Sequence, residues 1–411
     1  MTRPTLSHAA MTQFPLAGDE LLVGGMPLTR LAERVGQTPF YAYDRQAISA
    51  RIDSLKAVLP ARLELHYAIK ANPMPALVAH IASRVDGLDV ASAGELRVAL
   101  DAGMAAAAIS FAGPGKRAQE LRQAVAAGVC LNAESLTELQ RLHEASQALG
   151  LPARVALRVN PDFELKSSGM RMGGGAKPFG IDAEAIPAAL RRLAELELQF
   201  EGFHLYAGSQ SLRAEALIEA QSASFELALR LAAAAPGPLR TLNLGGGFGV
   251  PYFPGEARLD LAPIADHLAA LDAQLLSAQP QARLALELGR YLVAEAGVYV
   301  CRVQDIKQSR DTTFLITDGG LHQHLAASGN FGQVIRKNYP VLLGNKAGQN
   351  ADQRYSVVGP LCTPLDVLGS EVMLPQAAIG DLFVVLQSGA YGASASPRGF
   401  LSHPDVIEVL I

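Results

Sequence analysis

Residues 63–73 read LELHYAIKANP, an apolar stretch with the length of a buried strand that runs into Lys70. A helical pattern follows at once, and the same order of short strand and Ala/Leu-rich helix recurs along most of the chain. The strand candidates are 63–69, 88–90, 108–111, 129–131, 155–159, 200–206, 239–244 and 284–286, and helices are expected between them at 74–83, 93–102, 119–127, 135–149, 183–197, 213–234 and 264–278.

Eight strand–helix units within about 250 residues are typical of a (β/α)8 barrel, an α/β fold. An open doubly wound sheet is the alternative, and the number of units favours the barrel. After Arg290 helical patterns become rare, and strands are expected at 291–303, 314–317, 354–358 and 382–386. The sequence therefore predicts a barrel at 45–290 and a C-terminal β domain at 291–411, to which residues 1–44 contribute strands at 21–23 and 39–43.

The composition is that of a globular chain with 411 residues, 49% apolar and 18% charged side chains, and a net charge of −4. These values exclude general disorder, and the absence of basic blocks argues against nucleic acid or an anionic membrane as the main partner. No apolar run reaches the roughly 18 residues of a membrane span, and residues 1–20 lack a signal-peptide pattern.

Three cysteines cannot form a disulfide framework, so we expect a reducing compartment, the cytoplasm. A Gly/Ser/Met-rich stretch at 166–178 is expected to be a mobile loop.

Chemistry in a barrel enzyme takes place at the C-terminal ends of the strands, so the residues that follow each strand matter most. The first strand ends at Lys70. A partly desolvated lysine there would have a lowered pKa and a neutral amine that can form an imine. A lysine that simply extends to the rim is the alternative, and its position alone favours that alternative.

Two further strand ends carry residues that suit a phosphorylated, electron-withdrawing cofactor. The seventh strand runs into Gly245, Gly246 and Gly247, whose backbone N–H groups could converge on a phosphate, or which could form a turn without a ligand. The eighth ends at Glu287 and Arg290, which could face the barrel mouth or merely form a salt bridge there. An amine, a phosphate cradle and a carboxylate to pair with a ring nitrogen are together what pyridoxal phosphate (PLP) requires.

These residues belong to a longer ordered set of motifs. The set comprises YAIKAN at 67–72, DVAS at 89–92 with GEL at 94–96, FAGPGK at 111–116, RVNP at 158–161, GSQ at 208–210, GGG at 245–247, ELGR at 287–290, GPLC at 359–362 and GAY at 389–391. In this order the chain closely resembles the ornithine/diaminopimelate decarboxylase family of fold-type III PLP enzymes, which have an alanine-racemase-like barrel and a C-terminal β domain. It is most similar to the branch of PLP-dependent decarboxylases associated with the exosortase A system.

The resemblance implies a role for each matching residue. Lys70 would hold PLP as an imine, Asp89 would lie near that imine, and Glu287 would pair with the pyridine nitrogen. The residues implied at the phosphate or its surroundings are Ser209, Gly245, Gly246, Gly247, Gly289, Arg290 and Tyr391. Cys362 would come from the β domain of the other subunit of a homodimer and help to protonate the carbanion; a free cysteine is more often a small buried hydrophobe, but the Gly-Pro-x-Cys setting favours the functional interpretation.

Three departures from the family pattern limit the transfer of these roles. The family usually has His-x-His-x-Gly-Ser after the sixth strand, whereas this chain has His204 and then Tyr206, so Tyr206 would cover the ring and His204 is expected to be structural. Thr363 stands where an acidic residue often binds the distal ammonium of a diamine, which puts ornithine, lysine and diaminopimelate in doubt as substrates. Leu288 replaces a usual proline, a change expected to be minor.

A few remaining polar residues have weaker interpretations. Arg336 and Tyr339 lie where the family often contacts the substrate carboxylate, and Arg290, Thr363 and Tyr391 are further substrate candidates. His322 and His324 are two apart and could share one face of a strand, but without a third ligand cluster nearby a polar rim is favoured over a metal site.

The sequence thus predicts a PLP-dependent carboxy-lyase that removes the α-carboxylate of an amino acid, or of an amino-acid derivative that could be carrier-linked, with Lys70, Glu287 and Cys362 as its catalytic residues. Diaminopimelate decarboxylase proper is the first alternative, weakened by Thr363. An amino-acid racemase or a non-catalytic PLP-binding protein would share the barrel and the cofactor. The Glu287 and Cys362 motifs speak against a racemase, and the presence of both Lys70 and Cys362 speaks against a non-catalytic protein.

Overall fold

The computed structural model describes all residues except 1–6, 164–169 and 172. The chain forms two compact units. One contains residues 51–249 and 259–289, and the other contains residues 1–50, 250–258 and 290–411. The barrel was expected at 45–290; residues 45–50 and 250–258 instead have most of their neighbours in the second unit. The Gly/Ser/Met-rich loop expected at 166–178 lies partly outside the described residues.

The first unit contains a closed parallel barrel, as the sequence predicts. Its strands are β5 (Glu64–Ala68), β6 (Gly87–Val90), β7 (Ile109–Phe111), β8 (Cys130–Ala133), β9 (Arg154–Asn160), β12 (Gln199–Leu205), β14 (Thr241–Gly246) and β15 (Arg283–Leu288). They pair in this order, and β15 pairs with β5 to close the ring. Three two-residue strands belong to the same unit, namely β10 (Met170–Arg171), β11 (Ile181–Asp182) and β13 (Gly208–Ser209).

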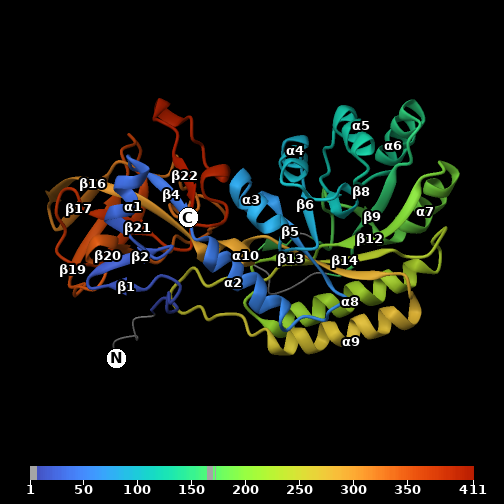
Figure 1. The fold of residues 1–411 in the computed structure, drawn as a ribbon, viewed down its shortest axis with the longest axis horizontal. Coiled ribbons are helices and arrows are strands. Elements are labelled where there is room, and N and C mark those ends of the chain that lie inside the picture. Colours follow the sequence, from blue (N-terminus) through green and yellow to red (C-terminus); the bar gives the residue numbers. More distant parts are fainter. Residues whose placement is uncertain (1–6, 164–169, 172) are drawn as a thin grey trace. The chain divides into compact units, whose positions relative to one another are not determined.

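Helices alternate with the barrel strands. They are α3 (Pro75–Ala82), α4 (Ala93–Asp101), α5 (Ala118–Ala127), α6 (Leu136–Leu149), α7 (Ile186–Glu195), α8 (Ala214–Ala232) and α9 (Ala262–Ala278), and α8 and α9 lie side by side in Figure 1. Their starting points follow from local chemistry: the side chains of Ser92 and Ser135 accept hydrogen bonds from backbone N–H groups in the first turns of α4 and α6. These two helices therefore begin shortly after strands β6 and β8, whereas longer segments separate α7 from β9 and α9 from β14.

Buried ion pairs support the strand ends of the barrel. Lys116 Nζ lies 2.7 Å from Glu138 Oε1, and Arg158 donates to Glu134 at 3.0 Å. All four side chains are at least nine-tenths buried, so removing one partner would leave an uncompensated charge. The FAGPGK and RVNP motifs contribute Lys116 and Arg158 to this framework.

The second unit is a mixed β structure. Neighbouring strands of its main sheet follow the order β18 (Val341–Leu343), β21 (Leu382–Val385), β16 (Gly297–Ser309), β17 (Thr312–Thr317), β19 (Gln353–Val358) and β20 (Val367–Leu374). Strand β4 (Phe40–Tyr43) pairs with both β16 and β22 (Ile407–Leu410), so the leading residues join the C-terminal sheet as expected. A separate three-stranded sheet is formed by β1 (Leu16–Ala17), β2 (Glu20–Val23) and β3 (Met26–Pro27). Helix α1 (Leu28–Val35) follows β3 in the chain, and α2 (Arg45–Lys56) follows β4.

One expected strand is wrong at its start. Residues 291–303 were expected to be extended throughout, but α10 (Arg290–Val293) and a single 3-10 turn at Ala294–Ala296 precede β16. The run YLVAEAGVYV is buried throughout, and a continuous apolar run does not distinguish strand from helix by its period.

Within the described part of the chain, no helix combines the length and the apolar character needed to cross a bilayer.

Candidate active site

Lys70 stands one residue beyond the expected strand, in a 3-10 turn at Ile69–Ala71 that follows β5. Its Nζ lies 3.2 Å from Glu287 Oε1 at the end of the neighbouring strand β15. The other carboxylate oxygen of Glu287 lies 3.1 Å from His204 Nε2, which β12 contributes. Glu287 and His204 are buried, whereas the Lys70 side chain is 42% exposed, so the amine is the accessible member of the group.

The charge state of Glu287 follows from these neighbours. Burial raises the pKa of a carboxyl group, but Lys70, the hydrogen bond from His204 and the charge of Arg158 outweigh burial, and the net pKa of Glu287 lies well below its ordinary value. Glu287 is therefore a carboxylate at neutral pH. An ionised carboxylate in this position can stabilise a protonated nitrogen placed against it.

Tyr206 and Asp89 lie around the same strand ends. Lys70 Nζ lies 5.3 Å from the centroid of the Tyr206 ring, which puts an aromatic face beside the amine. Asp89 is buried on β6, where it is in register with Ala68, two residues before Lys70. His66 on β5 holds Asp89 through an Nδ1–Oδ1 contact of 3.3 Å. The sequence analysis did not single out His66, because this residue lies within a predicted buried strand and follows no recognised motif.

The glycine triplet forms a tight, crowded turn at the end of β14. The backbone N–H of Gly245 donates to Asn243 Oδ1 at 2.8 Å, and Gly245 and Gly247 have φ values of +68° and +80°. A Cβ on Gly245 would lie 2.6 Å from Tyr206 Cδ2, and one on Gly247 would lie 2.4 Å from the carbonyl oxygen of Gly208. Only glycine fits these positions, so the backbone here can approach a ligand closely.

Ser209 and Gly289 complete the residues that the sequence assigned to the barrel. Ser209 is half-buried in the short strand β13, which pairs with β10, and it follows Gly208, whose carbonyl lies against Gly247. A Cβ on Gly289 would lie 2.9 Å from Ala71 Cβ, directly after the Lys70 turn. Glycine at 289 therefore allows the ends of β15 and β5 to pack closely beside Lys70.

Arg290 and Tyr391 meet in the second unit. The Arg290 guanidinium lies 4.6 Å from the centroid of the Tyr391 ring, and its Nη1 donates to the Tyr252 hydroxyl at 3.1 Å. Burial opposes the charge, but the surrounding tyrosines keep the pKa of Arg290 above its ordinary value. Arg290 Nε is buried without a hydrogen-bond partner among the described residues, so one donor of this cation is available to an anion. Tyr252 was not among the predicted residues.

The two weaker substrate candidates have different surroundings. Tyr339 is buried, with its ring centroid 4.7 Å from that of Tyr252, so it belongs to the aromatic cluster around Arg290. Arg336 instead donates a hydrogen bond to the carbonyl oxygen of Val367. The pKa of Arg336 is lowered by burial, with Asp366 opposing.

Cys362 is exposed, in contrast to the buried Cys130 and Cys301. Its loop is held by the buried carboxylate of Asp366, which accepts hydrogen bonds from the backbone N–H groups of Leu361 and Leu321 at 2.9 and 2.6 Å. Thr363 follows, and its hydroxyl accepts a hydrogen bond from the Leu365 N–H at 3.3 Å. The loop thus presents a thiol and a neutral hydroxyl side by side.

His322 and His324 are both buried, so they do not form the polar rim that the sequence favoured, and their neighbours differ. His324 is fully buried, lies 2.8 Å from Ser388 Oγ through its Nε2, and packs against Tyr41 and Tyr299. The His322 ring lies 4.9 Å from that of His403. Across the described residues, no group of three His, Cys, Asp or Glu side chains is arranged to hold a metal ion.

Residues 45–294 match the family model described as "Pyridoxal-dependent decarboxylase, pyridoxal binding domain". The chain belongs to the pyridoxal-dependent decarboxylase family. It is 39% identical to L-glutamyl-[BtrI acyl-carrier protein] decarboxylase of Niallia circulans, over 93% of this chain and 90% of that protein. It is 34% identical to diaminopimelate decarboxylase of Pseudomonas aeruginosa, over 93% and 89% of the two chains.

Solved structures of decarboxylases have the same fold. Diaminopimelate decarboxylase of Helicobacter pylori in complex with L-lysine is 28% identical to this chain with a TM-score of 0.83, covering 93% of this chain and 94% of that one. These relatives are PLP-dependent decarboxylases, which confirms the predicted α/β barrel with its β domain, the carboxy-lyase activity and the cofactor. Their names favour decarboxylation over the racemase and non-catalytic alternatives.

The residues of this pyridoxal-dependent decarboxylase fit the cofactor of the family. The barrel unit offers an accessible amine, an ionised carboxylate 3.2 Å away and a turn of glycines that no side chain can enter. Asp89 Oδ2 is buried without a hydrogen-bond partner among the described residues, which leaves an acceptor unused beside the Lys70 strand. An unused buried acceptor is costly unless a ligand supplies the donor.

Proposed function

We propose that this decarboxylase releases CO2 from the α-carboxylate of an amino acid that is bound to an acyl carrier through its side chain. The support comes from Thr363, which offers no charge to a free distal ammonium, and from the 39% identity to a decarboxylase named for a glutamyl group on an acyl-carrier protein. A free diamino acid would leave its second ammonium without a partner at Thr363, at a cost of several kcal/mol in a desolvated site.

The chemistry restricts how such a substrate is attached. The reaction needs a free α-amino group to replace Lys70 and a free α-carboxylate to leave. For a glutamyl group, the remaining point of attachment is the side-chain carboxyl. The carrier bond removes the side-chain charge, so an uncharged residue such as Thr363 matches the substrate better than an acidic one.

The barrel residues have separate tasks in this reaction. Lys70 supplies the amine that holds PLP, and the glycine turn at 245–247, with Ser209 and Gly289, binds or supports its phosphate end. The bound cofactor supplies an electron sink for the pair released when the bond from Cα to the carboxylate breaks. The ionised Glu287, which His204 contacts at 3.1 Å, would hold a proton on a ring nitrogen of the cofactor. Tyr206, beside Lys70, would contact the ring, and Asp89 would accept a hydrogen bond near the Lys70 nitrogen.

The second unit contributes the remaining groups. We propose that Arg290, whose Nε has no hydrogen-bond partner among the described residues, binds an anionic group together with Tyr391. Arg336 and Tyr339 stay candidates for substrate contacts. We propose that the enzyme is a homodimer in which the exposed Cys362 enters the active site of the partner and returns a proton to Cα. All three cysteines are free, which supports a reducing, cytoplasmic location, and the placement in the exosortase A-associated branch stays a prediction.

A substrate panel tests the proposal. The PLP-loaded enzyme is given meso-diaminopimelate, free L-glutamate and L-glutamate joined through its side-chain carboxyl to a phosphopantetheinyl carrier or to N-acetylcysteamine, and released CO2 is measured. We expect the thioesters to be turned over, with kcat/KM for the carrier-linked form at least tenfold above that for diaminopimelate. Equal or better turnover of diaminopimelate would contradict the proposal and support the alternative of a diaminopimelate decarboxylase.

A further inference from the structure

His66 is a buried titratable residue inside the barrel for which the proposed mechanism has no task. It lies on β5, four residues before Lys70, and is 8% exposed. Its Nδ1 lies 3.3 Å from Asp89 Oδ1 on β6, and its Nε2 lies 3.7 Å from Glu64 Oε2 on its own strand. Each imidazole nitrogen therefore faces a carboxylate.

These two carboxylates keep the imidazole charged. Burial alone would lower the pKa of His66, but Asp89 and Glu64 outweigh it and raise the pKa from 6.5 to about 10. Other charged groups near the ring are already paired: Arg154 lies 2.9 Å from Glu201, and Glu287, in register with His66 on β15, contacts Lys70 and His204. His66 is thus the cation that balances Asp89 in the barrel interior.

The neighbouring strand leaves room for this ring. Gly87 on β6 is in register with His66, and a Cβ there would lie 2.6 Å from His66 Nε2 and 2.7 Å from the carbonyl oxygen of Ala108. A side chain at 87 would push the imidazole away from Asp89. Glycine at 87 and histidine at 66 therefore form one packing arrangement that fixes the ring against the carboxylate.

The contact fixes one oxygen of Asp89 and leaves the other available. Oδ1 faces the imidazole, whereas Oδ2 is buried with no hydrogen-bond partner in the described part of the chain. Because Asp89 is in register with Ala68, it lies beside the strand end that carries Lys70. A carboxylate anchored through one oxygen presents the second in a fixed direction, which is what an acceptor for a protonated nitrogen requires.

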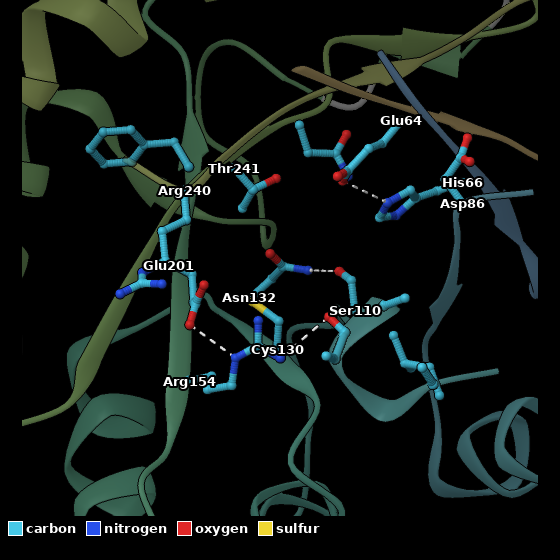
Figure 2. A pocket seen from close by; sticks show the side chains of 16 residues that line it. Glu64, His66, Asp86, Ser110, Cys130, Asn132, Arg154, Glu201, Arg240 and Thr241 are labelled. Carbon is cyan, nitrogen blue, oxygen red and sulfur yellow. Dashed lines mark hydrogen bonds and ion pairs between the residues drawn. The ribbon is translucent and has the colours of Figure 1, made fainter. Parts of the chain in front are cut away.

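Figure 2 shows His66 among the side chains that line a pocket. The ring lies in the wall of a pocket of about 300 Å3, beside Glu64 and across from Arg154 and Glu201. Several lining residues are the first residues of barrel strands, among them Glu64, Cys130, Arg154 and Thr241. The pocket therefore lies at the N-terminal end of the barrel. His66 therefore lies toward the end of the barrel opposite Lys70.

We propose that His66 is a positioning residue for the decarboxylation: it orients and charge-balances Asp89, so that Asp89 Oδ2 accepts the hydrogen bond of the nitrogen that joins Lys70 to the cofactor. The inference rests on the proposed roles of Lys70 and Asp89 and adds the residue that acts through them. His66 itself touches neither cofactor nor substrate.

A double-mutant cycle tests this role. His66→Gln keeps a donor of similar size without the charge, and Asp89→Asn removes the carboxylate. In the PLP-loaded enzyme we measure kcat and the pKa of the visible absorption band, which reports the protonation of the Lys70-linked nitrogen. We expect His66→Gln to reduce kcat roughly tenfold and to move the pKa of the band, and to do neither in the Asp89→Asn background, because coupled residues are not additive. Equal effects in both backgrounds, or an unmoved band, would overturn the proposal.

A second measurement does not depend on the cofactor. NMR titration of histidine-labelled apoenzyme, with His66 assigned by its loss in His66→Gln, should show His66 protonated through pH 8, and its pKa should fall in Asp89→Asn. Titration of His66 near its ordinary value in the unmodified protein would overturn the pairing. Thr241→Val, in the wall of the same pocket, is the control that should leave kcat and the band unchanged. If no band forms and borohydride labels no peptide containing Lys70, the proposed function fails, while the titration still decides the pairing.

Discussion

Lys70 Nζ lies 3.2 Å from Glu287 Oε1, although 217 positions separate the two residues in the chain. The closure of the barrel brings them together, because β15 pairs with β5 and places the first and last strand ends side by side. The amine and the carboxylate that the sequence assigned to opposite ends of one cofactor thus form an ion pair in the protein alone. The closure of the barrel therefore sets the distance between the two groups that the sequence assigned to the cofactor.

Replacing Lys70 should abolish turnover, and two variants separate the lost amine from the lost charge. Lys70→Ala removes both, whereas Lys70→Arg keeps a cation that can pair with Glu287 but cannot form an imine. We expect no CO2 release above background from either variant. Denaturant unfolding should show Lys70→Arg closer in stability to the unmodified apoenzyme than Lys70→Ala. CO2 release by Lys70→Ala would refute the role of this residue.

The stability of the apoenzyme should depend on pH through Glu287. Its pKa is lowered in the folded protein, despite burial, by Lys70 and His204, so its stabilising contribution is present above the pKa of the unfolded chain and is lost as the pH falls. Glu287→Gln should cost about 1 kcal/mol in the free energy of unfolding at pH 7, since it removes an ion pair whose lysine is 42% exposed and therefore partly screened by solvent. The difference between the two proteins should shrink as the pH falls below about 4. Urea unfolding at several pH values measures it; a difference independent of pH would contradict the assigned charge.

The glycine turn should tolerate no side chain when the cofactor binds. Gly247→Ala puts a Cβ 2.4 Å from the carbonyl oxygen of Gly208, whereas Gly103→Ala, at nearly the same φ of +81°, meets nothing within 4 Å. Both variants carry the backbone strain of about 1–2 kcal/mol, but only the first displaces the turn. We expect the Kd for PLP, measured by fluorescence titration of apoenzyme, to rise at least tenfold for Gly247→Ala only. Equal Kd values for the two variants would remove the turn from the cofactor site.

Local patterns were sufficient for the barrel but not for contacts across it. The sequence predicts all eight barrel strands, because each is a short apolar run bounded by helical patterns or turn residues. It fails at 291–296, where a fully buried run has no diagnostic period, and it does not predict β18, β20 and β22. Strand β20 has eight residues, whereas β18 and β22 are only three and four residues long. Short strands of this kind owe their existence to pairing partners that are remote in sequence.

The candidate site divides in the same way. Motifs identified Lys70, Glu287 and the glycine turn, since their spacing from strand ends is local information. His204 was expected to be structural, yet its Nε2 lies 3.1 Å from Glu287, and His66 was not singled out at all. Both histidines depend on a carboxylate of another strand, so only the register between strands reveals them.

Mixing two inactive variants tests the proposed dimer. If Cys362 acts in the site of the partner subunit, Lys70→Ala and Cys362→Ala chains that exchange subunits form mixed dimers with one intact site. Random mixing should then restore about a quarter of the activity of the unmodified enzyme, because half of the dimers are mixed and each has one active site of two. CO2 release after co-refolding measures it, with each variant alone as control. No recovery despite mixed dimers, detected by two affinity tags, would place Cys362 in the site of its own chain.

The last prediction concerns Thr363, whose hydroxyl accepts a hydrogen bond from the Leu365 N–H at 3.3 Å. Thr363→Asp and Thr363→Asn both retain an acceptor for this bond, so the loop that carries Cys362 should keep its conformation in both. Only the aspartate adds a negative charge, which favours a free distal ammonium and repels nothing in an uncharged thioester. We therefore expect Thr363→Asp to raise kcat/KM for diaminopimelate about tenfold or more, whereas Thr363→Asn leaves it unchanged.

The two substrates must be measured on the same variants, because specificity is a ratio. For the carrier-linked glutamyl substrate, Thr363→Asp should lower kcat/KM through the cost of a desolvated, unpaired carboxylate, and Thr363→Asn should lower it less. A parallel change for both substrates would mean that position 363 affects the loop and not recognition. A gain confined to diaminopimelate, and confined to the charged variant, would identify position 363 as the point at which this enzyme distinguishes an amine-ended substrate from an acylated one.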